Sequence, residues 1–264
     1  MMGQRSEFLG FHFDCFSQSQ VIEALGMTVR QGQFAYVVTP NVDHVVARHA
    51  RADDQALEAA YGNANLTLCD SRILQLLARW SGIELPLVTG SDLTVALLQA
   101  LNEAGQAQVG VIGGTPALLA ELRRLHPRIA WQQHIPPMGV RRDSAARREI
   151  SAFVEAAELD YILFAIGAPQ SELVCAEIVE RGQARGVALC IGASLEFVTG
   201  EKRRAPQIWQ RLRLEWLFRL LSEPRRLWRR YLVEGPKIAS IWLRWRANRA
   251  HQLAASASSQ LGSS

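Results

Sequence analysis

The clearest pattern in the chain is an alternation between short apolar runs and longer segments whose apolar residues recur at helical spacing. The apolar runs are 34–39, 65–69, 108–112, 129–134, 161–166 and 186–191, preceded by a loosely alternating stretch at 7–13. Helical spacing appears between these runs, over 17–30, 42–50, 53–61, 72–80, 93–104, 116–126, 143–157 and 171–181. Such alternation with short connections is typical of right-handed βαβ units. It predicts an α/β fold with a Rossmann-like parallel sheet flanked by helices.

The run 34–39 is followed by polar residues that are suited to a ligand site. Its residues are apolar, aromatic or β-branched up to Thr39, which indicates a strand buried on both faces. Pro40 ends the strand and Asn41 can cap the next helix. Ligands of open α/β sheets bind at such strand ends, although the segment alone is more often an ordinary strand–turn–helix.

The run 65–69 ends in a similar way, with Asp70 at the start of a helix. An aspartate at this position is most often an N-cap. The alternative is that Asp70 lies at a second strand end, close to Thr39 and Asn41, and acts as a base. The pattern alone leaves both interpretations open.

Small residues follow the later strands and predict a nucleotide-binding edge. Gly113 and Gly114 lie between a strand and a helix, where backbone N–H groups can approach a phosphate. The full GxGxxG and Walker patterns are absent, so the glycine pair alone is weak evidence. Gly167 and Gly192 end two further strands, and Gln170 follows the first of these.

Charge divides the chain near residue 200. Residues 1–200 carry 15 Arg, no Lys and 21 acidic residues, whereas 201–249 carry 14 basic residues against 4 acidic ones. We therefore expect a Rossmann-like domain over 1–204, a basic, Trp-rich helical appendage over 205–249, and a disordered tail over 250–264. Four scattered cysteines indicate a reducing compartment. No secretion signal or apolar run of 18 residues is evident.

The appendage has three competing interpretations. Five tryptophans alternate with arginines in it, namely Trp209, Trp216, Trp228, Trp242 and Trp245. An amphipathic helical pair at a bilayer surface explains both residue types best. A packing face is the second alternative, and nucleic-acid binding is the least favoured because no motif for it accompanies the charge.

The chemistry available excludes several enzyme classes. We find no Ser-His-Asp spacing, no HExxH, no DxD pair, and no clustering of the six histidines, so metal catalysis has little support and no cofactor is expected. An NAD-type dehydrogenase is disfavoured because GxGxxG is missing after the first strand. The polar residues at the strand ends suit a metal-free transfer from a nucleotide donor. Such a reaction needs a carboxylate base, amide side chains that orient sugar hydroxyls, and positive charge near the leaving diphosphate.

Seven segments, taken together, resemble the WecB/TagA/CpsF glycosyltransferases (glycosyltransferase family 26). They are TPNVDH at 39–44, the Asp70 segment, TGSD at 89–92, GAPQSE at 167–172, GASLEF at 192–197, KRRAP at 202–206 and LEWLFRLLSEPRRLWRRY at 214–231. The similarity runs in order from about residue 8 to 235. It is much more specific than any single motif.

The resemblance implies an inverting, metal-independent hexosyltransferase that moves a sugar from a UDP-sugar to a polyprenyl (undecaprenyl) diphosphate-linked sugar. Asp70 would be the general base, with Thr39, Asn41 and Gln170 in the same pocket. The appendage would meet the cytoplasmic face of the inner membrane, as a peripheral protein. Its arginines Arg219, Arg226 and Arg229 would bind diphosphate, Arg225 and Arg230 being adjacent alternatives.

One departure from the family bears on the donor. Many members have Pro-Asp-Gly where this chain has Cys69-Asp70-Ser71. The carboxylate is kept but its surroundings differ, so N-acetylmannosamine, its uronic acid and glucose all remain candidate sugars. The Arg-rich composition favours exopolysaccharide over teichoic acid biosynthesis. The alternative from another class is a non-catalytic basic Rossmann-like protein that binds a nucleotide or nucleic acid. The oligomeric state stays open, a homo-oligomer included.

Overall fold

The computed structural model describes residues 4–201 and, beyond them, 209, 215–222, 224–228, 232–233 and 235–261. Its centre is a six-stranded sheet in the order β4-β3-β8-β7-β5-β6, in which every neighbouring pair is parallel. The strands are β3 (Phe34–Val38), β4 (Leu66–Thr67), β5 (Gln108–Ile112), β6 (Ala130–His134), β7 (Tyr161–Phe164) and β8 (Gly186–Cys190). The predicted α/β fold with a parallel sheet is confirmed.

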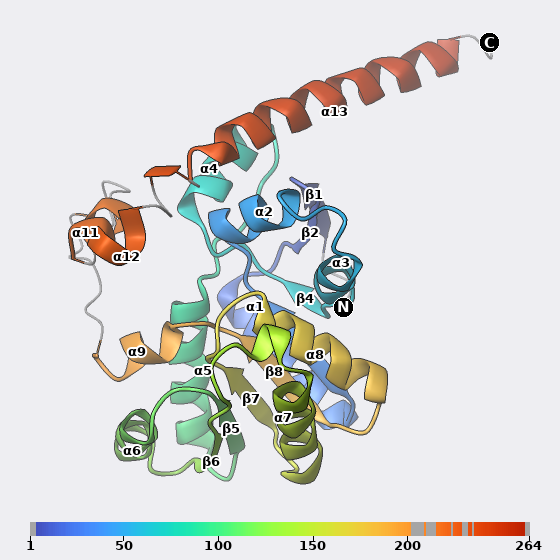
Figure 1. The fold of residues 1–264 in the computed structure, drawn as a ribbon. Helices are drawn as coiled ribbons and strands as arrows, with labels where there is room; N and C mark the ends of the chain where they lie inside the picture. Colours follow the sequence, from blue (N-terminus) through green and yellow to red (C-terminus); the bar gives the residue numbers. More distant parts are fainter. Residues whose placement is uncertain are drawn as a thin grey trace.

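Helices cover both faces of the sheet (Figure 1). One face packs against α1 (Gln18–Gln31), α5 (Gly90–Ala104) and α6 (Pro116–Leu125). The other packs against α3 (Gln55–Gly62), α7 (Ser144–Ala156) and α8 (Gln170–Arg181). Strands β3, β7 and β8 are buried on both faces, which is why they appear in the sequence as continuous apolar runs.

The N-terminal segment differs from its prediction. The alternating stretch at 7–13 predicts one strand, but the structure has two, β1 (Arg5–Phe8) and β2 (Phe11–Asp14), paired antiparallel. Leu9 and Gly10 adopt left-handed conformations with φ of 52° and 83°. Two such residues form the tight turn that joins hairpin strands, and the alternation of apolar residues did not reveal it.

The remaining helices lie beyond the carboxyl ends of the strands. They include α2 (Val42–His49), α4 (Arg72–Arg79), α9 (Ser194–Val198) and the short 3₁₀ helix η1 (Val140–Arg142). After the sheet domain come α11 (Glu215–Ser222), α12 (Pro224–Trp228) and the long α13 (Lys237–Leu261). α13 continues to Leu261, although small polar residues from 250 onward predict a disordered tail. Alanine, the best helix former, recurs in this stretch.

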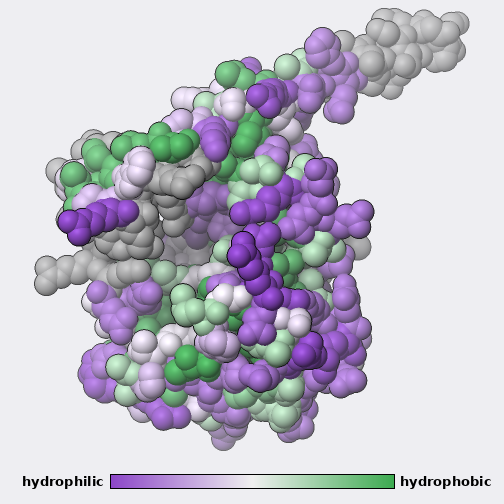
Figure 2. All heavy atoms as spheres, viewed as in Figure 1, coloured by the Kyte–Doolittle hydropathy of each residue, from purple (hydrophilic) through white to green (hydrophobic). Residues whose placement is uncertain are grey.

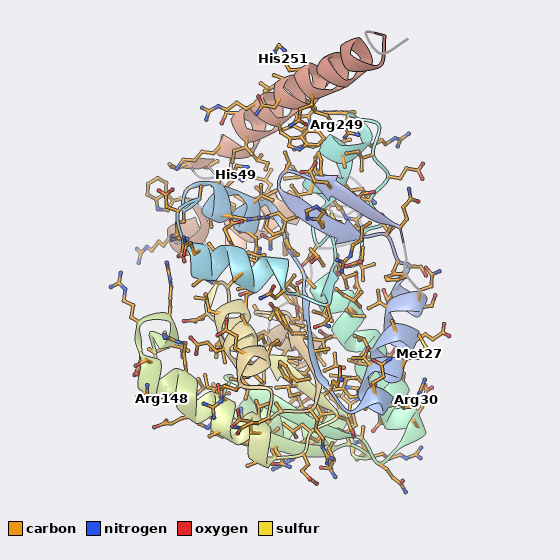
Figure 3. All side chains as sticks on the ribbon, turned by 90° about the vertical axis from the view of Figure 1, so that its right-hand side faces the viewer. Met27, Arg30, His49, Arg148, Arg249 and His251 are labelled. Atoms are coloured by element: carbon orange, nitrogen blue, oxygen red, sulfur yellow. The ribbon has the colours of Figure 1, made fainter. Side chains whose placement is uncertain are left out.

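The first half of α13 packs on the sheet domain. Ile238 is buried, and Trp245 meets the ring of Phe8 edge to face at 5.1 Å. Trp242 donates from its indole N–H to Ser81 Oγ at 2.9 Å. Viewed from the side, Arg249 points from α13 toward the β1–β2 hairpin and His251 points away from it (Figure 3). These contacts favour the packing interpretation for Trp242 and Trp245.

No helix in the part of the chain that the structure describes combines the length and the apolar character needed to cross a membrane.

Candidate functional site

The candidate site lies where β3 and β8 end side by side. Residue Val38 of β3 is paired with Cys190 of β8, and the next side chain, Thr39, donates from Oγ1 to the Cys190 carbonyl at 3.2 Å. The chain then leaves β3 toward the α3 and α8 face of the sheet, and leaves β8 toward the α5 face. In doubly wound sheets, ligands bind where the connections from adjacent strand ends diverge to opposite faces.

Asp70 follows β4, the strand that neighbours β3. The Asp70 N–H donates to the Pro40 carbonyl at 3.0 Å, and a parallel bridge pairs Cys69 with Leu87. The adjacent Ser71, rather than Asp70, caps α4, since its Oγ accepts from Leu74 N–H at 3.2 Å. The N-cap interpretation of Asp70 is therefore wrong for this helix.

Gly90, the first residue of α5, lies at the centre of a polar cluster. A methyl group on Gly90 would lie 3.2 Å from Thr39 Oγ1, 3.3 Å from Ser194 Oγ and 3.6 Å from Asp70 Oδ2. Ser194 is buried and donates to the Ile191 carbonyl at 2.7 Å. Two hydroxyls and one carboxylate, from the segments that follow β3, β8 and β4, thus surround the start of a 15-residue helix. Sequence reasoning proposed Thr39 and Asp70 but missed Gly90 and Ser194.

Asn41 is the N-cap of α2, as predicted. Its Oδ1 accepts from the Asp43 N–H at 3.0 Å and lies 2.8 Å from His44 Nδ1. On the far side of the imidazole, His44 Nε2 lies 3.7 Å from Glu172 Oε1. Glu172 is 2% exposed, and burial raises the pKa of its carboxyl to about 7. Neither His44 nor Glu172 was proposed from the sequence.

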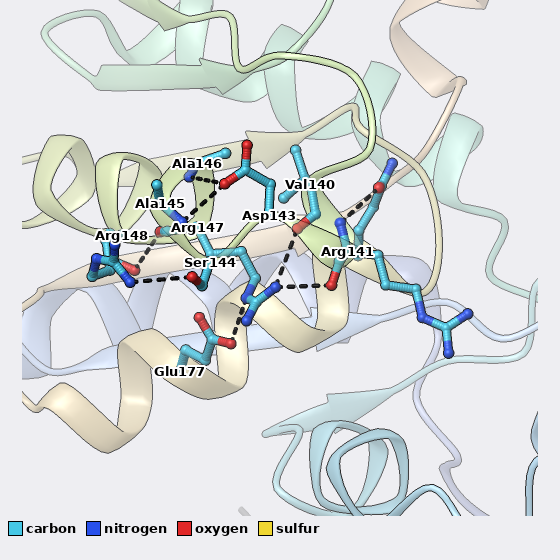
Figure 4. Close-up of polar contacts among 11 residues, drawn as sticks. Val140, Arg141, Asp143, Ser144, Ala145, Ala146, Arg147, Arg148 and Glu177 are labelled. Carbon is cyan, nitrogen blue, oxygen red and sulfur yellow. Dashed lines mark hydrogen bonds and ion pairs between the residues drawn. The ribbon is translucent and has the colours of Figure 1, made fainter.

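Gln170, at the start of α8, is engaged with the backbone around it. Its Nε2 donates to the Ile166 carbonyl, and its Oε1 accepts from the Arg141 N–H at 3.4 Å. Arg147 stabilises the 3₁₀ helix η1, which carries Arg141, by donating to the Val140 and Arg141 carbonyls (Figure 4). Gln170 therefore contacts the β6–α7 connection, and these hydrogen bonds do not join it to Thr39, Asp70 or Ser194.

The four glycines proposed for the nucleotide have other structural requirements. Gly113 and Gly114 have φ of 97° and 71°, and a Cβ on them would approach Ile166 to 2.8 Å and Leu118 to 2.7 Å. The Gly113 N–H already donates to the His134 carbonyl at 2.8 Å. Gly167 and Gly192 also have left-handed backbones, and nothing lies within 4 Å of where their Cβ would be. A role in donor binding stays a prediction for all four.

The proposed diphosphate arginines are only partly covered by the structure. Arg219 and Arg226 lie on α11 and α12, with side chains outside the described residues, and Arg229 lies wholly outside them. Hydrophobic side chains gather at the upper left of the molecular face shown in Figure 2, over α11, α12 and the start of α13. Exposed apolar residues in this region are Leu221, Trp228, Leu232, Val233 and Leu243.

Within the described residues, no three His, Cys, Asp or Glu side chains are grouped as metal ligands would be.

Comparison with known protein families agrees with this geometry. The model of the glycosyl transferase WecG/TagA/CpsF family matches residues 6–252, which includes the sheet, the polar cluster around Gly90 and most of α13. The match covers far more than half of the 264 residues. The chain therefore belongs to the WecG/TagA/CpsF family of glycosyltransferases.

Proposed function

We propose that this chain transfers a hexose or N-acetylhexosamine, with inversion and without a metal ion, from a UDP-sugar to a polyprenyl-diphosphate-linked sugar. Family membership supports the coarser statement: a transferase in polysaccharide or teichoic acid biosynthesis, with a sugar-nucleotide donor and a lipid-linked acceptor. The uridine nucleotide, the undecaprenyl lipid, the inversion and the base are our proposal.

The observation that carries the proposal is the convergence of Asp70, Thr39 and Ser194 at the start of α5. Inversion needs one base, which removes the proton of the acceptor hydroxyl while its oxygen attacks C1 of the donor sugar. The C1–O bond to the diphosphate breaks, and UDP leaves with that electron pair. In this proposal Asp70 takes the proton. The partial positive charge of the α5 N-terminus favours the departing diphosphate.

The appendage would supply the remaining functions. Arginines are suited to diphosphate because the guanidinium can bind two phosphate oxygens at once. We assign this role to Arg219, Arg226 and Arg229. The exposed apolar residues of α11 and α12, Leu221 and Trp228 among them, support a peripheral position on the cytoplasmic face of the inner membrane.

A donor screen tests the reaction class. The purified chain is incubated with a panel of UDP-sugars, a short-chain prenyl-diphosphate-linked sugar and EDTA, and UDP release is measured. Acceptor-dependent release from one donor would support the proposal and identify the sugar. If no donor gives UDP release, while folding and UDP binding are confirmed, the result would favour a nucleotide-binding protein that catalyses no transfer.

Asp70→Asn tests the base. The asparagine keeps the shape of the side chain but cannot take a proton, so we expect turnover to fall by about 10²- to 10⁴-fold. The affinity for UDP, measured by calorimetry, should stay within a few-fold of wild type. Asp53→Asn is the matched control, because Asp53 is exposed and lies outside the site. Near-normal turnover of Asp70→Asn would remove Asp70 from the mechanism.

A further inference from the structure

Glu172 is an unusual buried carboxylate. Among the described residues, the buried acidic side chains are those of Asp14 and Glu172. Asp14 is paired with Arg5 at 2.7 Å and accepts from the Thr67 N–H at 2.8 Å. Glu172 Oε2, by contrast, has no hydrogen-bond partner within the described part of the chain. An unsatisfied buried carboxyl group is costly for folding, so its presence calls for another explanation.

Among the described residues packed around Glu172, His44 is a group that can share its proton. Tyr36 and Tyr61 approach from β3 and α3, and Cys175 and Cys190 from α8 and β8. Burial raises the pKa of both tyrosines and of Cys190 well above neutral pH, so these groups stay uncharged. Histidine is the side chain whose ordinary pKa lies nearest to neutral pH, and Nε2 of His44 lies 3.7 Å from the Glu172 carboxyl.

His44 connects Glu172 to Asn41. The Asp43 N–H donates to Asn41 Oδ1, which places the amide oxygen on the side of His44. Because that oxygen carries no hydrogen, the 2.8 Å contact with His44 Nδ1 is attractive only when Nδ1 is protonated. Nδ1 is also 3.2 Å from the Asn41 backbone N–H, but that longer contact would require the other tautomer.

The contacts to Asn41 leave its amide nitrogen available. Both use Oδ1, and no described residue accepts a hydrogen bond from Asn41 Nδ2. The side chain is thus held by its oxygen at the carboxyl edge of the sheet, next to Thr39, with two N–H donors uncommitted. Amide donors of this kind bind hydroxyl and phosphate oxygens, as a sugar nucleotide offers.

We propose that Glu172 and His44 are positioning residues, which share one proton and thereby hold the Asn41 carboxamide so that its N–H groups bind an oxygen of the sugar-nucleotide donor. This inference rests on the proposed function. The shared proton lies between the Glu172 carboxyl and Nε2 of His44. Nδ1–H of His44 then donates to Asn41 Oδ1 and prevents the amide from flipping.

The first test is a double-mutant cycle. Glu172→Gln should lower kcat/KM for sugar transfer about 10- to 100-fold, since small misplacements of binding groups have effects of this size. Asn41→Ser removes the amide but keeps an N-cap. In the Asn41→Ser background, Glu172→Gln should have almost no further effect, because it acts through Asn41. Full additivity would overturn the proposal. Glu180→Gln, exposed on the same helix, is the matched control.

The second test does not depend on turnover. Nitrogen NMR of labelled histidine follows the two ring nitrogens of His44 between pH 5 and 9. We expect Nδ1 to be protonated in wild type while Glu172 holds its proton, below about pH 7, and we expect the fraction with Nδ1–H to fall in Glu172→Gln. Identical spectra in both proteins would overturn the inference. If wild type transfers no sugar from any donor, the proposed function fails while the NMR result still decides whether the pair exists.

Discussion

Replacing Glu172 with glutamine should make the protein more stable at neutral pH, although we expect it to impair the site. The carboxyl is buried on α8, against Tyr36 and Tyr61, and burial raises its pKa from the usual 4.5 to about 7. Glutamine has nearly the same shape but cannot ionise. The substitution therefore removes a charge that the folded state accommodates poorly.

The magnitude follows from proton linkage. Between pH 4.5 and pH 7 the folded protein keeps a proton on Glu172 that the unfolded chain has lost. The free energy of unfolding therefore falls as pH rises through this window, because the folded state accommodates the protonated carboxyl of Glu172 better than the ionised one. At about 1.4 kcal/mol per pH unit, wild type loses up to about 3 kcal/mol by pH 8. Sharing of the proton with His44 lowers this figure.

The assay is urea unfolding at a series of pH values from 4.5 to 8, for wild type and Glu172→Gln. The two free energies of unfolding should be similar at pH 4.5 and should differ by up to about 3 kcal/mol at pH 8, with the variant more stable. Glu180→Gln should show no such divergence, since Glu180 is exposed. A constant difference across the pH range would refute the reasoning, because it would mean that Glu172 ionises as easily in the folded state as in the unfolded one.

Three further predictions concern the site entrance and the appendage. Gly90→Ala should lower the rate of sugar transfer at least about tenfold with little change in melting temperature. The added methyl group would displace the hydroxyls of Thr39 and Ser194, which lie 3.2 and 3.3 Å from it. Unchanged kinetics would contradict this crowding. Trp245→Ala should reduce the hydrogen-exchange protection of α13 and weaken its packing on the sheet domain by about 2 kcal/mol. Leu243→Ala is the control and should have little effect, because the Leu243 side chain is 58% exposed. The double variant Leu221→Ser, Trp228→Ser should bind anionic vesicles at least about tenfold more weakly in a sedimentation assay, since each substitution removes an exposed apolar side chain. Equal binding of variant and wild type would mean that these residues are not the membrane contact.

The strands were predictable because their physical requirement is local. A strand buried on both faces must be apolar throughout, so β7 is visible as the run Tyr-Ile-Leu-Phe. Helix starts were also predictable where a capping residue precedes them, as Asn41 does for α2. The turn at Leu9 and Gly10 was not, because a left-handed leucine has no sequence signature.

The candidate site was predictable only as far as strand ends mark it. Thr39 and Asp70 follow apolar runs, and parallel strands bring their carboxyl ends to one edge. The importance of Gly90 depends on which loops meet over it, a tertiary fact that no spacing contains.

Glu172 shows the limit most clearly. In the sequence it is one of several glutamates on an amphipathic helix, and a charged residue on such a helix is normally expected to face solvent. Only the packing of α8 against β3 and α3 reveals that it is buried beneath His44. A residue whose ionisation weakens the fold carries a cost in stability, and our proposal gives Glu172 a role in the site that offsets it. The opposite effects expected of Glu172→Gln, a more stable protein with a slower reaction, would be the signature of that trade-off.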